Sequence, residues 1–424
     1  MDLICRESRL RGAVEIPGSK SHTIRAVAIA ALAEGESVIR EPLESKDAEA
    51  CVTAYRAFGA EMALAPEAWR VQGVGGELRT PDNVIDVGNS GTTLRIAMGS
   101  AALLRAGAVV LTGDAQIRKR PGGPLAHALT ELGARVRSTR DNGCAPFVVE
   151  GRLRGGKTSL EAVTSQYLSS LLMAVPLADG DTEIAVPVLN EAPYVTMTLD
   201  WLERQGIVLE HDGLRWFRVP GGQRYQPFDR RIPGDFSSAT FFLAAGALEE
   251  NDILARGLDI EDAQGDKAVL DYLRAMGADV AVEEDGIRVR PKTLEGTELD
   301  LNATPDALPM LAVLGCFASG TTRLVNVPQA RLKETDRIAV MCRELAKLGA
   351  HIEELPDGLV IHQSALHGGE VDGHEDHRVV MALAIGATQI AEPVRIRGFE
   401  AAGVTYPGFF EELTRLGGKA RITG

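Results

Sequence analysis

The stretch DYLRAMGADVAVEEDGIRVR, residues 271–290, contains the pattern from which the fold can be predicted. Apolar residues before Gly277, such as Leu270 and Leu273, lie at helical spacing, and a glycine at this point is typical of the position just after a helix. Alternating residues then flank Asp285-Gly286, a dipeptide typical of tight β-hairpin turns. The stretch therefore predicts helix, strand, turn and strand in that order.

The same pattern occurs six times along the chain. Its glycine recurs at intervals of 68 to 74 residues, at Gly59, Gly133, Gly206, Gly277, Gly349 and Gly417. Six repeats of about 71 residues account for the full length of 424 residues. Because the sixth repeat stops after one strand, we expect the segment from Leu3 to Ile16 to pair with it and close the ring.

A short polar or glycine-rich segment precedes an Ala- and Leu-rich helix in each repeat. The six segments are Gly18-Ser19-Lys20-Ser21, Gly88-Asn89-Ser90-Gly91-Thr92-Thr93, Thr164-Ser165-Gln166, Gly234-Asp235-Phe236-Ser237-Ser238, Thr304-Pro305-Asp306 and Glu375-Asp376-His377-Arg378. Ile16-Pro17-Gly18 recurs three repeats later as Ile232-Pro233-Gly234. We therefore predict two domains of three repeats each, a discontinuous one of residues 1–15 plus 231–424 and a second one of residues 16–230.

Composition limits the class of partner and the location. The chain has 45 Lys and Arg against 59 Asp and Glu, a formal net charge of −14, and 45% hydrophobic residues. This acidic balance argues against nucleic acid or an anionic membrane surface as the main partner. Apolar runs are too short for membrane helices, the first residues lack a signal-peptide pattern, and five scattered cysteines fit a reducing compartment. We therefore predict a soluble cytoplasmic protein.

The polar segments point to an anionic ligand. Helix N-termini attract phosphate and carboxylate because their free N–H groups carry about half a positive charge. Cations accompany these segments or lie in nearby loops, at Lys20, Arg25, Arg95, Arg120, His377 and Arg378, and in the run Lys333 to Arg337. Two simpler interpretations stay open, namely that the Ser and Asp residues only cap helices and that the charged run is a solvated face. The histidine spacing predicts no metal site.

Together the motifs resemble the 5-enolpyruvylshikimate-3-phosphate synthase family throughout all six repeats. The matching residues are Gly18-Ser19-Lys20-Ser21 with Arg25, Gly88-Asn89-Ser90-Gly91-Thr92 with Arg95, Arg120-Pro121, Ser165-Gln166-Tyr167, Pro193-Tyr194, Pro305-Asp306, Lys333-Glu334-Thr335-Asp336-Arg337 and Asp376-His377-Arg378. The resemblance implies an α/β fold of two inside-out barrel domains, each built from three βαβαββ repeats, with the active site in a cleft that closes on substrate.

The resemblance also implies the reaction. The enolpyruvyl group of phosphoenolpyruvate would pass to the 5-hydroxyl of shikimate 3-phosphate, releasing phosphate, in the shikimate pathway of aromatic amino acid biosynthesis. No metal or organic cofactor is implied, and the family precedent is a monomer. The catalytic residues implied are Lys20, Asp306 and Glu334. Those implied for shikimate 3-phosphate are Lys20, Ser21, Arg25, Thr164, Ser165, Gln166, Tyr194, Asp306, Gln329 and Lys333. Those implied for phosphoenolpyruvate are Lys20, Asn89, Gly91, Arg120, Gln166, Arg337, His377 and Arg378.

Three positions depart from the commoner pattern of that family. Gln329 replaces an asparagine, and Val404 replaces a lysine near the phosphate of the donor. Glu191 replaces a serine near the sugar phosphate, so we expect its carboxylate to turn away or form a salt bridge, unless the acceptor lacks that phosphate.

Other functions stay open at this point. One is an enolpyruvyl transferase for UDP-N-acetylglucosamine or another cyclic alcohol, and another is a catalytically silent binding protein or scaffold. The loop from Asp114 to Arg120 lacks the cysteine usual in the UDP-N-acetylglucosamine enzymes, which favours the shikimate reaction.

Overall fold

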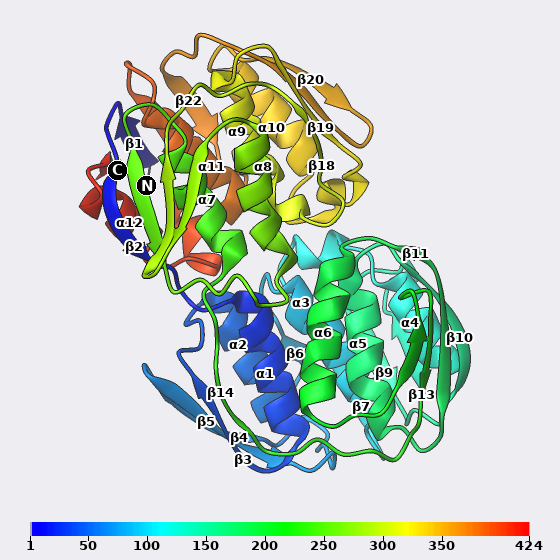
Figure 1. The fold of residues 1–424 in the computed structure, drawn as a ribbon. Helices are drawn as coiled ribbons and strands as arrows, with labels where there is room; N and C mark the ends of the chain where they lie inside the picture. Colours follow the sequence, from blue (N-terminus) through cyan, green and yellow to red (C-terminus); the bar gives the residue numbers. More distant parts are fainter. Residues whose placement is uncertain (1, 424) are drawn as a thin grey trace. The chain divides into compact units, whose positions relative to one another are not determined.

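The computed structural model describes residues 2–423. By its internal contacts the chain divides into a discontinuous unit, Met1–Pro17 with Pro233–Gly424, and a continuous unit, Gly18–Ile232. Both divisions lie two residues beyond the boundaries expected from the sequence. Each unit is described by itself (Figure 1).

The continuous unit contains three four-stranded sheets of one design. In each sheet a parallel pair of strands is followed by two strands that continue the sheet with antiparallel pairing. In spatial order the strands are β14 (Asp229–Arg231), β3 (Glu34–Arg40), β5 (Ala68–Val74) and β4 (Glu61–Ala65); β6 (Ile85–Asp86), β7 (Ala108–Thr112), β9 (Phe147–Glu150) and β8 (Arg135–Ser138); and β10 (Gly156–Ala162), β11 (Thr182–Leu189), β13 (Trp216–Val219) and β12 (Glu210–Asp212).

The discontinuous unit repeats this design in three further sheets. In spatial order the strands are β2 (Arg11–Glu15), β15 (Asp252–Arg256), β17 (Gly286–Arg290) and β16 (Asp279–Glu283); β18 (Glu298–Asp300), β19 (Thr321–Val325), β21 (Gly358–His362) and β20 (His351–Leu355); and β22 (Gly369–Asp372), β23 (Val394–Arg397), β1 (Asp2–Arg6) and β24 (Lys419–Thr423).

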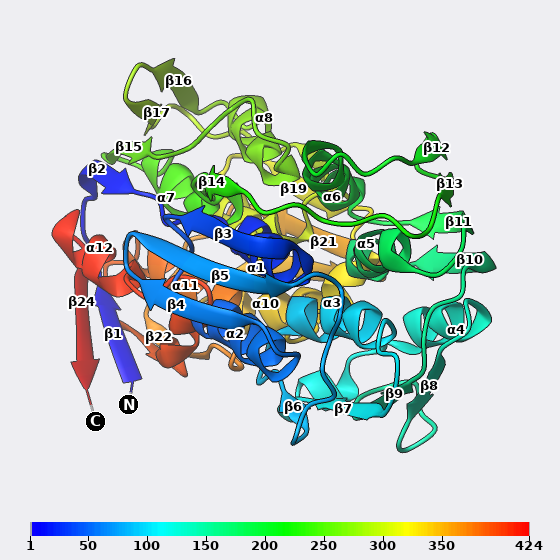
Figure 2. The ribbon, with the colours of Figure 1, turned by 90° about the horizontal axis from the view of Figure 1, so that it is seen from below.

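The N-terminal segment closes the ring only in part. Strand β1 pairs with β24, and the two strands lie side by side in Figure 2. The expectation for the rest of Leu3 to Ile16 was wrong, because β2 pairs with β15 in a different sheet. The Leu10 N–H donates to Asn251 Oδ1 (2.7 Å) just before β2, which holds the chain against the start of β15. A strand from a distant part of the chain also completes the first sheet of the continuous unit, because β14 pairs in parallel with β3.

Two α-helices accompany each sheet. In the continuous unit they are α1 (Lys20–Leu32), α2 (Lys46–Ala57), α3 (Gly91–Ala101), α4 (Gly123–Glu131), α5 (Ser165–Ala174) and α6 (Ala192–Arg204), with the 3₁₀ turns η1 (Ile117–Lys119) and η2 (Val175–Leu177). In the discontinuous unit they are α7 (Phe236–Gly246), α8 (Val269–Ala275), α9 (Leu308–Phe317), α10 (Arg337–Ala346), α11 (His377–Ala387) and α12 (Phe409–Arg415), with η3 (Gly265–Ala268), η4 (Pro305–Ala307), η5 (Pro328–Leu332) and η6 (Phe399–Val404).

One helix of each pair forms the core. Helices α3, α7 and α11 are buried along their whole length, and α1, α5 and α9 nearly so. Their Ala, Gly and Leu content leaves no polar stripe, as expected for helices surrounded by protein. In the strands, buried and exposed residues tend to alternate, as in β10, so one sheet face meets the helices. Helices inside and sheets outside give the inside-out α/β arrangement.

Glycines end the helical segments as the sequence predicts. Gly59, Gly133, Gly206, Gly277, Gly349 and Gly417 all have positive φ, between +69° and +108°. This region favours glycine, which has no Cβ to clash with the backbone. Among residues 2–423, no helix is both long and apolar enough to cross a membrane.

Candidate active site

Three core helices of the continuous unit begin with a hydroxyl cap. Ser19, Ser90 and Thr164 precede α1, α3 and α5, and each side chain accepts a backbone N–H of the first turn. The helix starts are linked, because Gln166 Nε2 at the start of α5 donates to Thr92 Oγ1 at the start of α3 (3.1 Å). Backbone N–H groups of several helices therefore point toward one polar region of this unit.

Lys20, at the start of α1, is held by a carboxylate. Its Nζ lies 3.3 Å from Asp47 Oδ2, and both side chains are largely buried. Sequence reasoning missed Asp47, which looks like an ordinary first-turn acid of α2. The ion pair fixes the position of the ammonium group without making it inaccessible.

Arg25 lies one turn further along α1 and is anchored by protein groups. Its guanidinium donates to Thr198 Oγ1 (2.9 Å), Ser169 Oγ (3.2 Å) and the carbonyl oxygens of Ser21 and Tyr194 (3.0 Å each). Burial lowers the pKa of Arg25 to about 10. The side chain therefore positions Ser21 and Tyr194, two residues expected to contact the acceptor.

Two further arginines surround the glycine-rich segment before α3. A Cβ added to Gly91 would come within 2.5 Å of Arg95 Nη1 and 2.7 Å of Arg120 Nη1, so a side chain here would push the two guanidinium groups away. Arg95 donates to Gln166 Oε1 (2.9 Å) and to the Pro121 carbonyl (3.1 Å). Burial lowers the pKa of Arg95, and the Arg120 charge adds to this effect. The loop that holds Arg120 is thereby tied to α3 and α5.

Asn89 is held by the same loop. Its side-chain nitrogen donates to Asp114 Oδ2 (2.7 Å) and Gln116 Oε1 (2.6 Å). The amide oxygen is left as the group of this side chain that can meet a ligand donor.

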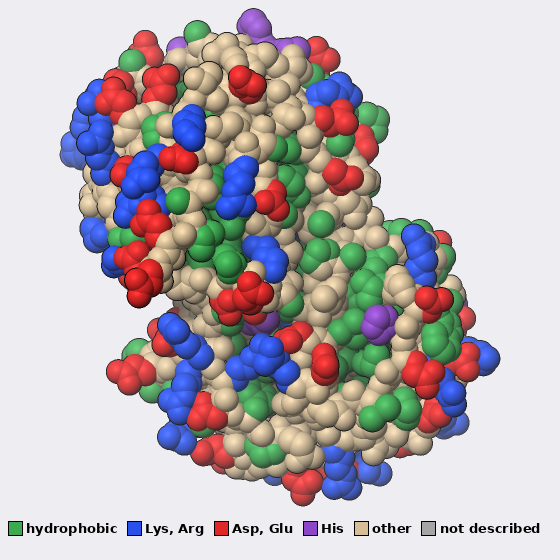
Figure 3. Space-filling view, viewed as in Figure 1, with side chains coloured by type: hydrophobic (Ala, Val, Ile, Leu, Met, Phe, Trp, Pro, Cys, Tyr) green, Lys and Arg blue, Asp and Glu red, His purple; other side chains and the backbone are tan. Residues whose placement is uncertain are grey.

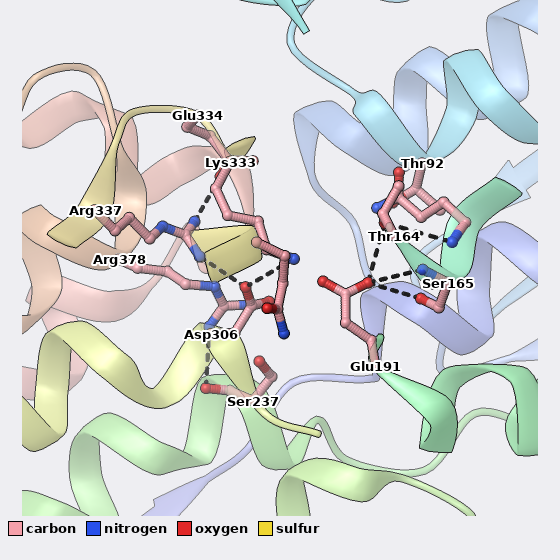
Figure 4. A network of polar contacts seen from close by, with 12 residues as sticks. Thr92, Thr164, Ser165, Glu191, Ser237, Asp306, Lys333, Glu334, Arg337 and Arg378 are labelled. Carbon is pink, nitrogen blue, oxygen red and sulfur yellow. Dashed lines mark hydrogen bonds and ion pairs between the residues drawn. The ribbon is translucent and has the colours of Figure 1, made fainter. Parts of the chain in front are cut away.

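Glu191 occupies the start of α5 rather than turning away. Its Oε2 accepts hydrogen bonds from Thr164 Oγ1 (3.0 Å), the Ser165 N–H (3.1 Å) and Ser165 Oγ (2.8 Å). Figure 4 shows the carboxylate pointing at Thr164 and Ser165. The side chain is 2% exposed. Of the three alternatives expected for Glu191, namely turning away, forming a salt bridge or facing an acceptor without that phosphate, the first was therefore wrong.

In the discontinuous unit, Arg337 is the centre of a carboxylate cluster. Its guanidinium meets Asp306 (2.7 Å), Glu334 (2.5 Å) and Asp376 (2.8 Å), and it is only 1% exposed. Burial opposes its charge, but the carboxylates outweigh that effect and raise the pKa of Arg337. Asp376 also caps α11 by accepting the Arg378 N–H (2.9 Å). The sequence suggested only this capping role for Asp376.

Asp306 faces two more cations. Arg378 Nη2 lies 2.8 Å from Asp306 Oδ2, and Lys333 Nζ lies 3.8 Å from Asp306 Oδ1 (Figure 4). Arg378 also donates to the Ser237 carbonyl (3.3 Å), which joins the starts of α7 and α11. Each carboxylate predicted to act as a base is thus paired with an arginine predicted to bind the donor.

The remaining predicted residues of this unit lie at helix starts and turns. His377 begins α11 and is buried. Gln329, in η5, donates through Nε2 to the Asn302 carbonyl (2.8 Å), while its buried Oε1 has no hydrogen-bond partner among the described residues. Val404 ends η6.

The charged side chains of the candidate site are buried, unlike those of the protein surface. Acidic and basic side chains are interspersed over the visible face of each unit (Figure 3). In contrast, Arg25, Arg95, Arg120, Arg337 and Arg378 are each less than 10% exposed. Burying so many cations is unfavourable unless anions pair with them, which fits sites for anionic ligands on an acidic protein.

Comparisons with known proteins agree with this chemistry. The EPSP synthase (3-phosphoshikimate 1-carboxyvinyltransferase) family matches residues 4–413. The 3-phosphoshikimate 1-carboxyvinyltransferase of Ruminiclostridium cellulolyticum is 53% identical over 422 residues, which is 100% of both chains. That of Acetivibrio thermocellus is 52% identical and covers 98% of both chains.

Solved structures share the fold. EPSP synthase from Acinetobacter baumannii matches with a TM-score of 0.85 at 27% identity over 100% of both chains. The enolpyruvyl transferase NikO from Streptomyces tendae matches with a TM-score of 0.77 at 21% identity, over 100% of this chain and 98% of its own.

Proposed function

The chain belongs to the EPSP synthase (3-phosphoshikimate 1-carboxyvinyltransferase) family. We therefore propose that the buried charged residues described above, in the continuous and in the discontinuous unit, act on one pair of anionic substrates. The reaction transfers the enolpyruvyl group of phosphoenolpyruvate to the 5-hydroxyl of shikimate 3-phosphate and releases phosphate. It belongs to the shikimate pathway of aromatic amino acid biosynthesis. The proposal assigns the binding and catalytic roles in this reaction to individual residues.

The acceptor binds around the start of α5. Shikimate 3-phosphate contacts Lys20, Ser21, Arg25, Thr164, Ser165, Gln166 and Tyr194 of the continuous unit and Asp306, Gln329 and Lys333 of the discontinuous unit. Support comes from Thr164 and Ser165, whose three donors converge on a single carboxylate oxygen. Such a convergence suits a phosphate oxygen equally well.

The donor binds to the arginines and to the glycine-rich segment. Phosphoenolpyruvate contacts Lys20, Asn89, Gly91, Arg120 and Gln166 of the continuous unit and Arg337, His377 and Arg378 of the discontinuous unit. Support comes from the absent side chain at Gly91, which lets both Arg95 and Arg120 approach the backbone there. Phosphate and carboxylate groups match the planar guanidinium, which can donate two hydrogen bonds side by side.

The transfer is an addition followed by an elimination. Asp306 accepts the proton of the 5-hydroxyl as its oxygen bonds to C2 of the donor, and Glu334, which is protonated when this step begins, delivers its proton to the methylene carbon C3. The tetrahedral intermediate collapses when Glu334 takes a proton back from C3 and the C2–O bond to phosphate breaks, and the proton that Asp306 accepted leaves with the phosphate. Lys20 stabilises the charge of the leaving phosphate.

The pairing of these carboxylates with arginines carries the proposal. Arg337 pairs with both Asp306 and Glu334, and Arg378 also pairs with Asp306. The carboxylate of the donor replaces them as counter-ion of the arginines, which frees both for proton transfer. Donor binding thereby makes the base Asp306 and the acid–base residue Glu334 available at the reacting atoms.

Phosphate release tests the proposal. Purified protein with phosphoenolpyruvate and shikimate 3-phosphate releases phosphate and forms the enolpyruvyl ether, identified by NMR, whereas UDP-N-acetylglucosamine as acceptor gives no product. Asp306→Asn and Glu334→Gln each lower kcat by roughly a hundredfold or more while the proteins stay folded. Near-normal turnover of either variant would reject its assigned role.

The proposal extends to the domain organisation, oligomeric state and cellular location of the enzyme. The enzyme works as a cytoplasmic monomer of two domains whose shared cleft binds the substrates, without metal or organic cofactor. Size-exclusion chromatography with light scattering tests the monomer, and activity after dialysis against a chelator tests the metal-free reaction.

A further inference from the structure

Glu191 adopts an unusual backbone conformation for its residue type. With φ 58° and ψ 39° it lies in the left-handed region, immediately before α6. This region costs a residue with a side chain about 1 kcal/mol, and glutamate has no special preference for it. The conformation directs the side chain into the protein, where the carboxylate is buried.

The carboxylate is bound as a ligand would be. Three donors, two hydroxyls and one backbone N–H, meet Glu191 Oε2 within 3.1 Å. They belong to Thr164 and Ser165 at the start of the ten-residue helix α5, where the helix dipole favours a negative charge. The Glu191 carboxylate therefore occupies the position at the N-terminus of α5 where an anionic ligand would bind.

The substrate phosphate needs the same donors. The proposed function assigns Thr164 and Ser165 to shikimate 3-phosphate, and the present inference rests on that assignment. Two anions about 4 Å apart repel by about 4 kcal/mol at an effective dielectric of 20, so they do not share the position.

We propose that Glu191 is an internal anion that fills the acceptor-phosphate subsite in the substrate-free enzyme and is displaced when the acceptor binds. The phosphate takes over the hydrogen bonds of Thr164 and Ser165, while the Glu191 side chain rotates toward solvent from its position between β11 and α6. The exchange makes Glu191 a specificity-determining residue, because an incoming anion has to bind the subsite more strongly than the carboxylate does. A phosphate dianion binds the subsite more strongly than the Glu191 carboxylate, whereas a singly charged, weakly binding anion does not.

Binding measurements on Glu191 variants test the exchange. Glu191→Asn suits the left-handed backbone and is too short to reach Ser165, and Glu191→Gln keeps the length without the charge. We expect Glu191→Asn to bind shikimate 3-phosphate about tenfold more tightly than the wild type by titration calorimetry, and Glu191→Gln to show a smaller gain. Inorganic phosphate should raise the melting temperature of Glu191→Asn more than that of the wild type. Glu203→Gln, an exposed change on the same helix, should alter neither quantity.

Two results overturn the inference in different ways. If Glu191→Asn and Glu191→Gln bind shikimate 3-phosphate no more tightly than the wild type, Glu191 does not compete with the phosphate. If Ser165→Ala added to Glu191→Asn leaves the affinity of Glu191→Asn unchanged, the phosphate does not bind at α5, and the assignment of the subsite fails with it. Tighter binding by Glu191→Asn than by the wild type, and weaker binding once Ser165→Ala is added to it, support both.

Discussion

Lys20 Nζ lies 3.3 Å from Asp47 Oδ2, with side-chain exposures of 13% and 7%. The two residues start neighbouring helices, α1 and α2, so their ion pair joins the two helix starts. A lysine on a flexible four-carbon chain needs such a partner to keep its charge in one place. Asp47 is thus a positioning residue for the ammonium group assigned to the leaving phosphate.

Neutralising Asp47 should slow catalysis without unfolding the protein. Asp47→Asn removes the ion pair but keeps a side chain of the same shape, and we expect kcat to fall about tenfold. The affinity for shikimate 3-phosphate should change much less. Steady-state phosphate release measures both, with Glu49→Gln on the exposed face of α2 as the control. Unchanged kcat in Asp47→Asn would mean that Lys20 holds its position without it.

Arg95 should control binding of the donor through its geometry rather than its charge. It bridges Gln166 and the Pro121 carbonyl with two different nitrogens. Arg95→Lys keeps the charge but cannot span both partners, so the KM for phosphoenolpyruvate should rise about tenfold. Arg105→Lys, which changes an exposed arginine paired with Glu77, serves as control. An unchanged KM in Arg95→Lys would refute the bridging role.

Glu344 should stabilise the discontinuous unit in a pH-dependent way. Its buried carboxylate meets Lys347 (2.6 Å), His374 (2.9 Å) and Arg343 (3.1 Å) and accepts the Asp372 N–H (2.9 Å). Burial alone would raise the pKa of Glu344, but these hydrogen bonds lower it to about 2. Since its partners Lys347 and Arg343 are about half exposed, Glu344→Gln should lower the free energy of unfolding at pH 7 by roughly 2 kcal/mol.

The sign of the pH effect follows from the lowered pKa. The contribution of Glu344 is fully present above the unfolded-state pKa, about 4.3, and is lost as pH falls through about 2. Urea denaturation at pH 7 and pH 3 should therefore show the difference between wild type and Glu344→Gln shrinking by about half. Glu353→Gln on the exposed side of β20 should show no such trend. A difference that grows toward low pH would contradict the pairing.

The repeats could be predicted from the sequence because their signals are local. A glycine such as Gly277 ends its helical segment through its own φ, and Asp376 caps α11 through residues two positions away. Alternation within a strand shows that it is half-buried but not which sheet it joins. For that reason the pairing of β2 with β15 could not be foreseen.

The partners of the charged residues depend on tertiary contacts. Motifs located Lys20, Asp306 and Arg337, but Asp47 is separated from Lys20 by a whole strand, and nothing in its surroundings marks it as more than a first-turn acid. Glu191 attracted attention only as a departure from a family pattern. That it binds Ser165 depends on the fold of β11 and α6 and on its left-handed backbone.

Deuterium exchange at the donor methylene tests most directly whether Glu334 moves the proton at C3. With phosphoenolpyruvate and shikimate 3-phosphate in D₂O, the wild-type enzyme should place deuterium on the methylene carbon of the enolpyruvyl product, seen by NMR. Glu334→Gln should lose exchange and turnover together, by roughly a hundredfold or more, because it cannot deliver or remove the proton. Exchange and turnover near the wild-type rate in Glu334→Gln would contradict the account.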